Sequence, residues 1–363
     1  MLTVSVLILL WPRGEPSFDR RELGFSTSVI VAVVTDVIDG ECTFASGLEC
    51  RTAEFTIAEG SDAGLATWQQ FEISSFTPDF DVGEQVILNV IDNPELGTIF
   101  EYADRDRRPV LAVLLIVFSL AVVALGRVRG LAALGGLFLS VAVLVVFVAP
   151  SILVGNDPVL VATAGGAAIA LATIYLAHGW NRISHVAVIG TLSALALTLG
   201  LSWIVAAAAK FSGFATEEAV FVSLVETVDI GGLILAGAVL GAIGALDDIT
   251  VTQAATVLEL HEVGDRAETV DLYRRGLRVG RHHIASTVNT LFLAYAGAAL
   301  PLILLYSLSG HRFDLLANSE EVAIEIVRTL VGSIGLVAAV PITTWLAAWG
   351  LHQADTRPGI SAA

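Results

Sequence analysis

Charged residues are scarce in this sequence. Asp, Glu, Lys and Arg together make up 15% of the 363 residues, whereas 55% are hydrophobic and the mean hydropathy is +0.78. A soluble domain cannot bury so much apolar surface. The apolar residues also form blocks of roughly 18 to 25, the helix length that crosses about 30 Å of hydrocarbon. The sequence therefore predicts an all-α polytopic bundle whose main partner is the lipid bilayer.

Motifs that mark enzymes are also missing. The chain has no nucleophile elbow, no phosphate-binding glycine loop with its lysine, and no His-Glu-x-x-His zinc helix. His261, His282 and His283 lie in one predicted loop, but their spacing matches no metal-binding helix motif. We therefore predict no catalytic residue, no cofactor and no metal site, and an enzyme is the least favoured interpretation.

Basic residues are few between positions 13 and 106, although this segment holds more than half of the chain's 36 acidic residues. Such a balance repels phosphate backbones, so nucleic acid is excluded as a partner of this segment. A solvated acidic surface is favoured over a face that binds a cation. A protein partner for this segment remains open.

Cysteine is limited to Cys42 and Cys50, both in the acidic segment. Eight residues apart around a Ser-Gly turn, they can close a hairpin as a disulfide if the segment faces an oxidising compartment. Two free thiols are the alternative, and we favour the disulfide.

The segment 27–104 predicts a small, mostly antiparallel β domain. Ser28–Val37, Glu54–Ala58 and Glu84–Ile91 are rich in Val, Ile, Phe and Thr and are bounded by Gly and Asp. A barrel or a sandwich fits, and an OB-like barrel is suggested by analogy alone. Before it, residues 1–12 are apolar but too short to cross a bilayer, so we interpret them as a partial N-terminal transmembrane segment.

The region 109–352 predicts a transmembrane domain of about seven spans, at 109–126, 130–150, 158–179, 186–209, 229–247, 284–307 and 324–350. Between the fifth and sixth spans, 248–282 predicts a cytoplasmic loop with an amphipathic helix. Arginines concentrate at one side of these spans, at positions 127, 129, 182, 266, 274, 275, 278, 281 and 357. By the positive-inside rule, the β domain lies outside and the C-terminus lies in the cytoplasm.

One helical stripe in the fifth span carries the most informative residues. At 100° per residue, Gly237, Gly241, Gly244, Asp248 and Thr252 fall within an arc of about 80°. The three glycines predict close packing against another helix. Asp248 and Thr252, about 6 Å apart along the axis, can then face a shared polar pocket. The alternative is that the acids simply mark where the helix enters the headgroups.

Two other predicted spans bring polar groups to a similar depth. Asn289 and Thr290 lie near the start of the sixth span, and Thr343 and Thr344 near the end of the seventh. These four residues complete the predicted intramembrane polar site around Asp248. Packing between helices is the alternative role for the same groups.

The stretch Gly241-Ala-Ile-Gly-Ala-Leu-Asp-Asp-Ile-Thr-Val-Thr-Gln-Ala-Ala-Thr-Val-Leu-Glu-Leu resembles the YibE/F family of bacterial membrane proteins. The segments beginning at Val288 and Leu330 support the resemblance. The family pattern has an acid at Asp248, and Asp247 is an addition to it. The resemblance implies a multi-pass protein of the bacterial cytoplasmic membrane and leaves its substrate open.

Polar groups and prolines inside apolar spans favour a secondary permease for a small solute or ion. The alternative is a non-transporting scaffold or sensor whose outer β domain binds a partner. A polar cavity reaching the intramembrane acid distinguishes the first hypothesis from the second.

Overall fold

A computed structural model describes residues 2–14, 28–93, 97–225, 227–263, 268–308 and 313–356. The chain forms two compact units, one of Phe18–Ala121 and one of Met1–Ser17 with Val122–Ala363. Arg266 and Arg357, which contribute to the predicted orientation, lie outside the described residues.

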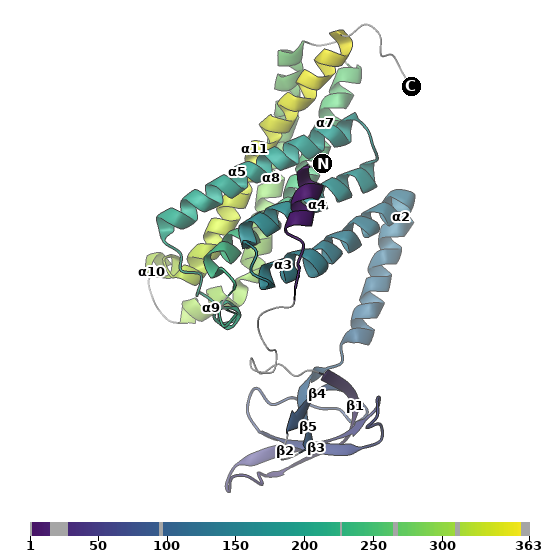
Figure 1. Ribbon diagram of the computed structural model, residues 1–363, viewed down its shortest axis with the longest axis vertical. Helices are drawn as coiled ribbons and strands as arrows, with labels where there is room; N and C mark the ends of the chain where they lie inside the picture. The colour runs from purple at the N-terminus through teal and green to yellow at the C-terminus, as the bar shows by residue number, and fades with distance from the viewer. Residues whose placement is uncertain are drawn as a thin grey trace. The chain divides into compact units, whose positions relative to one another are not determined.

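The first unit contains a nearly closed barrel of five antiparallel strands (Figure 1). The strands are β1 Ser28–Glu41, β2 Glu49–Ile57, β3 Ala66–Glu72, β4 Gln85–Asn93 and β5 Gly97–Arg105. Their order is β3-β2-β1-β4-β5. The two edge strands meet, because the Tyr102 N–H on β5 donates to Gln69 Oε1 on β3 at 2.8 Å. The predicted β domain is therefore a barrel and not a sandwich.

Apolar side chains, which alternate along each strand, fill the interior of the barrel. Val34, Phe55 and Leu88, from three different strands, are at most 1% exposed and belong to one core cluster. Phe80, from the segment between β3 and β4, packs edge-on against Phe55 with ring centroids 5.7 Å apart. A register shift between Val34 and Asp36 marks a bulge in β1, which bends a strand that pairs with both β2 and β4.

A disulfide joins Cys42 and Cys50 across the β1–β2 hairpin, with Cα atoms 4.9 Å apart. Both cysteines are buried, and the Cys42 N–H donates to the carbonyl of Leu48 at 3.0 Å. The bridge therefore closes the loop that the spacing predicts.

The second unit is helical. Its elements are α1 Leu2–Leu9, the later part of α2 Arg108–Val143, the π-helix η1 Leu144–Val148, α3 Ala149–Leu153, α4 Pro158–His178, α5 Arg182–Ala209, α6 Glu217–Val222, α7 Ile230–Val263, α8 Thr269–Ala298, α9 Leu300–Leu308, α10 Phe313–Ala317 and α11 Glu320–Thr356. Local sequence sets the helix boundaries. Asp157 caps α4 by accepting from the Leu160 N–H, and Asn181 caps α5 by accepting from the Ser184 N–H.

Among the described residues, five helices are long and apolar enough to cross a membrane, or up to six if α8 and α9 form one span. Two features explain why this number is smaller than the predicted seven. The predicted spans 109–126 and 130–150 both fall in one run, Arg108–Leu153, which is interrupted by non-helical geometry at Arg127. The predicted span 284–307 falls across α8 and α9, which are bent by 60°.

Much of the predicted loop 248–282 is helix. α7 continues to Val263 and α8 begins at Thr269. The extension is stabilised by burial, because Val257 of α7, Leu272 of α8 and Leu351 of α11 belong to one core cluster. The sequence suggested a boundary at the acid pair, but the apolar periodicity continues past it.

The centre of the bundle is α7, which packs against α4, α5, α8 and α11 (Figure 1). Val239, Leu246 and Ile249 of α7 are buried with Leu336 and Val340 of α11. Glycines on the surrounding helices permit close packing, both against α7 and between these helices. A Cβ at Gly166 of α4 would clash with Ile243, and one at Gly335 of α11 would clash with Thr198 of α5.

Candidate functional site

Asp248 and Thr252 lie on an exposed face of α7. The Thr252 hydroxyl donates to the backbone carbonyl of Asp248 at 2.6 Å, which satisfies it within its own helix. Asn289 and Thr290 are exposed on α8, and Thr290 donates to the carbonyl of Ser286. No hydrogen bond found among the described residues joins either of them to Asp248.

The neighbouring acid, Asp247, points into the helix bundle. Its Oδ2 accepts from the Thr173 hydroxyl of α4 at 2.7 Å. Its Oδ1 is buried and has no hydrogen-bond partner. No cationic side chain in the described part of the chain forms an ion pair with it. A buried carboxylate oxygen without a partner is energetically costly unless the carboxyl group is protonated or pairs with a cation.

One to two turns further along α7, buried polar side chains connect to three other helices. The Gln253 amide donates to Thr344 Oγ1 of α11 at 2.7 Å and to the Gly276 carbonyl of α8 at 2.9 Å. Thr250 and Thr191 of α5 share a hydrogen bond of 2.6 Å, and both are fully buried. With Asp247 and Thr173, these groups form what we call the polar layer of the bundle.

Thr343 borders the polar layer but has no hydrogen-bond partner for its buried hydroxyl. Its side chain packs on Gly190 of α5, where an added Cβ would clash with the hydroxyl and lie 3.2 Å from Thr343 Cβ. The predicted residues Thr343 and Thr344 are therefore both buried, and Thr344 contacts Gln253 instead of Asp248.

The glycine stripe of α7 lies beside polar side chains. A Cβ at Gly237 would lie 3.3 Å from Arg328 Nη2 of α11, and one at Gly241 would clash with the Tyr295 hydroxyl of α8. A Cβ at Gly244 would meet nothing within 4 Å. The first two glycines thus make room for a guanidinium and a phenol.

Those two polar groups line a cavity of about 540 Å³ at the N-terminal end of α7, here called the α7 N-terminal cavity. Its walls come from the segment 213–222 and from α7, α8, α9 and α11. Ile234 marks its limit along α7, and Glu321, Glu325 and Arg328 are its charged residues from α11.

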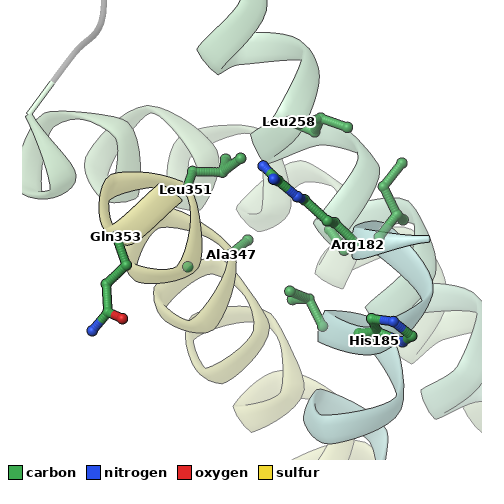
Figure 2. A pocket seen from close by; sticks show the side chains of 10 residues that line it. Arg182, His185, Leu258, Ala347, Leu351 and Gln353 are labelled. Carbon is green, nitrogen blue, oxygen red and sulfur yellow. The ribbon is translucent and has the colours of Figure 1, made fainter. Parts of the chain in front are cut away.

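A second cavity, of about 330 Å³, lies at the other end of α7 and is called the α7 C-terminal cavity. It is bounded by the start of α5, by Ala254 and Leu258 of α7, and by the end of α11. Figure 2 shows Arg182 extending from α5 between Leu258 and Leu351, with His185 nearby. His185 Nδ1 lies 2.8 Å from the Tyr175 hydroxyl, at hydrogen-bond distance.

Several of these residues were not predicted from the sequence. Gln253 and Thr250 have a visible signal, because they are polar residues on the same helical face as Leu246 and Val257. Arg328 also has a visible signal in the sequence, because with Glu325 it places a pair of opposite charges inside an apolar run. For Asp247, no signal separated it from Asp248 except the position of the buried face.

The fold and these sites define a class: a bundle of long apolar helices, fit for a membrane, with a buried polar layer and a cavity at each end of its central helix. A model of the YibE/F-like protein family matches residues 114–353, so the chain belongs to this family. The resemblance seen in the sequence is thereby confirmed. No curated protein and no solved structure matches the chain.

Proposed function

We propose that the protein is a secondary permease for a small solute or ion in the bacterial cytoplasmic membrane. One observation carries this proposal: two cavities lie at opposite ends of the same pair of helices, α7 and α11. From Ile234, which lines one cavity, to Ala254, which lines the other, α7 rises about 30 Å, the thickness of a hydrocarbon core.

The region between the cavities suits a closed gate. Leu246, Ile249 and Val340 are fully buried there, so the two cavities are separated by packed side chains. The polar layer lies at the end of this region next to the α7 C-terminal cavity, where Thr250 and Gln253 are four residues and one residue before Ala254. Polar groups inside apolar helices mark the pathways of solutes and ions in transporters. A permease that opens to one side of the membrane at a time needs both a closed gate and polar groups along the pathway.

Orientation follows from the charges. The positive-inside rule places the arginine-rich ends of the helices, with the α7 C-terminal cavity, on the cytoplasmic side. The α7 N-terminal cavity then opens outward. The disulfide between Cys42 and Cys50 supports an outer location for the barrel, because disulfides persist in oxidising compartments.

Site-directed labelling tests this orientation. Ser61→Cys, on an exposed turn of the barrel, should react with a membrane-impermeant maleimide in intact spheroplasts. Glu268→Cys, exposed between α7 and α8, should react only after lysis. The parent protein, whose two cysteines are paired, is the control for background. The opposite labelling pattern would contradict the orientation.

Flux measurements test the permease itself. Purified protein in liposomes on a solid-supported membrane should give saturable currents with at least one class among amino acids, carboxylates, amines and monovalent cations. Empty liposomes are the control. If folded protein gives no saturable response to any class, with or without a pH gradient, transport is not its function.

A scaffold or sensor is the second candidate. Its supporting observation is that two large aromatic side chains of the β domain are exposed: Trp68 of β3 is 58% exposed, and Phe76 in the segment after β3 is 93% exposed. Large exposed apolar side chains are enriched where proteins bind partners. A strand order that returns from β5 to β3 also suits an OB-like barrel, a fold that commonly binds ligands on its surface. If this candidate is correct, Trp68→Ser should prevent the barrel from binding its partner and should leave any flux across the membrane unchanged.

A further inference from the structure

The α7 N-terminal cavity contains an ion pair within an apolar helix. Arg328 Nη1 donates to Glu325 Oε1 at 2.5 Å, and the two side chains are 25% and 29% exposed. Charged groups inside an apolar span are expensive, and they commonly mark a ligand pathway. The pair lies about two turns from the start of α11, so it is not simply the charged end of the helix.

The Arg328 guanidinium has unused capacity to bind an anion. Its Nε is buried and has no hydrogen-bond partner, and only Nη1 contacts Glu325. A guanidinium presents its Nε–H and Nη2–H along one edge, which matches the two oxygens of a carboxylate. Gly237 of α7 faces this edge, and because an added Cβ would lie 3.3 Å from Nη2 and 3.8 Å from Nε, glycine leaves more room beside it than a larger residue would.

The same cavity also has capacity for a cation. Glu321 lies on the same face of α11, seven residues and about 10 Å before Arg328. The hydrogen bond found for its carboxylate is a long one, 3.4 Å from the Tyr306 hydroxyl. Glu325 lies between the two, so the charge on the α11 wall of the cavity changes from negative at Glu321 to positive at Arg328.

We propose that this cavity binds a small zwitterion, with its carboxylate on Arg328 and its ammonium group on Glu321. The assignment rests on the proposed permease function and names its substrate class. A simple anion would face three glutamates of the cavity wall, Glu218 of α6 with Glu321 and Glu325 of α11, and a simple cation would face Arg328. Because the two charged residues are about two turns apart, an extended ω-amino acid fits the cavity better than glycine does. The volume of about 540 Å³ suits a ligand of this size.

Calorimetry on the full chain in lipid nanodiscs tests the assignment. The zwitterionic probes are glycine, β-alanine, γ-aminobutyrate and ε-aminocaproate, and the singly charged controls are butyrate and butylamine. At least one of the extended zwitterions should bind at least tenfold more tightly than glycine and both controls. Equal binding of butyrate or butylamine, or no binding of any zwitterion, would overturn the proposal.

Variants locate the binding. Arg328→Gln and Glu321→Gln should each weaken zwitterion binding at least tenfold. Arg281→Gln and Glu259→Gln remove the same charges from exposed positions outside the cavity and should leave binding unchanged. Unchanged binding in both cavity variants would exclude this cavity.

A milder variant covers the case in which loss of a charge prevents folding. Gly237→Ala keeps every charge and places a methyl group 3.3 Å from Arg328 Nη2, so it should weaken binding several-fold. Gly244→Ala, on the same stripe but in open space, is its control. If Gly237→Ala and the folded charge variants all bind the zwitterion as the parent does, the assigned position is wrong. Binding that is not accompanied by flux would instead contradict the permease and leave the site in place.

Discussion

Replacing Asp247 by asparagine is expected to abolish ion-coupled flux while the protein still folds. The Asp247 carboxyl receives one hydrogen bond from Thr173 and has a second oxygen that is buried without a partner. Asparagine keeps the size of the side chain and an oxygen that accepts from Thr173. It removes the acid, and with it the group that can bind and release a proton or a cation. We expect at least a tenfold loss of coupled flux in proteoliposomes.

Asp248→Asn is the matched control for this result. Asp248 is the next residue of the same helix, carries the same charge and is exposed on the bundle surface. Its replacement should leave flux within about twofold of the parent. Loss of flux in Asp248→Asn alone would restore the first sequence interpretation, in which Asp248 is the central acid. Parental flux in both variants would remove the acids from the mechanism.

The choice between these two acids shows where sequence reasoning reached its limit. The stripe through Gly237, Gly241 and Asp248 was expected to be the packed face of α7, because small residues favour close helix contacts. The structure buries a different face, through Leu246 and Gln253. Both faces have a helical period, and a single sequence does not say which neighbours will cover them. Close contacts are made by Gly241 of the stripe, where an added Cβ would clash with Tyr295 of α8, and also by glycines on α4, α5, α8 and α11.

The helical class was easier to predict than the layout of the helices. Long apolar blocks identify helices because length and hydropathy are local properties, and the structure has five such helices among its described residues. The break at Arg127 falls between the predicted spans 109–126 and 130–150, whereas the bend between α8 and α9 falls inside the predicted span 284–307. The contact between Gln253 and Thr344 spans 91 positions of the sequence, so no local pattern predicts it.

The β domain illustrates the same distinction. Alternating apolar residues predicted strands near those now seen as β1, β2 and β4, but the edge strands β3 and β5 were not identified. β3, Ala66–Glu72, contains Trp68 and two glutamines and is only half buried, so its pattern is weak. The near closure of the barrel depends on these edge strands, through Gln69 and Tyr102.

Packing at the polar layer leads to a second large expected effect. Gly190→Ala should destabilise the bundle by about 1–3 kcal/mol, because the added methyl group clashes with the buried side chain of Thr343. Gly200→Ala is the control on the same helix, α5, since a Cβ there meets nothing within 4 Å. That variant should be neutral or stabilising by up to about 1 kcal/mol, because alanine favours helix over glycine.

The cause of the Gly190 effect can be isolated by a second substitution. Thr343→Ala removes a hydroxyl that has no hydrogen-bond partner together with a buried γ-methyl group, so alone it should lower the free energy of unfolding by about 1 kcal/mol, mainly through the lost methyl group. In the double variant the methyl group of Ala at position 190 occupies the space vacated by the threonine hydroxyl. Most of the lost stability should return, which gives a coupling energy of at least about 1 kcal/mol between the two positions. Unfolding titrations with SDS in mixed micelles measure all four proteins. If the two losses simply add, α5 and α11 do not meet at Gly190 and Thr343, and the polar layer is not packed as described.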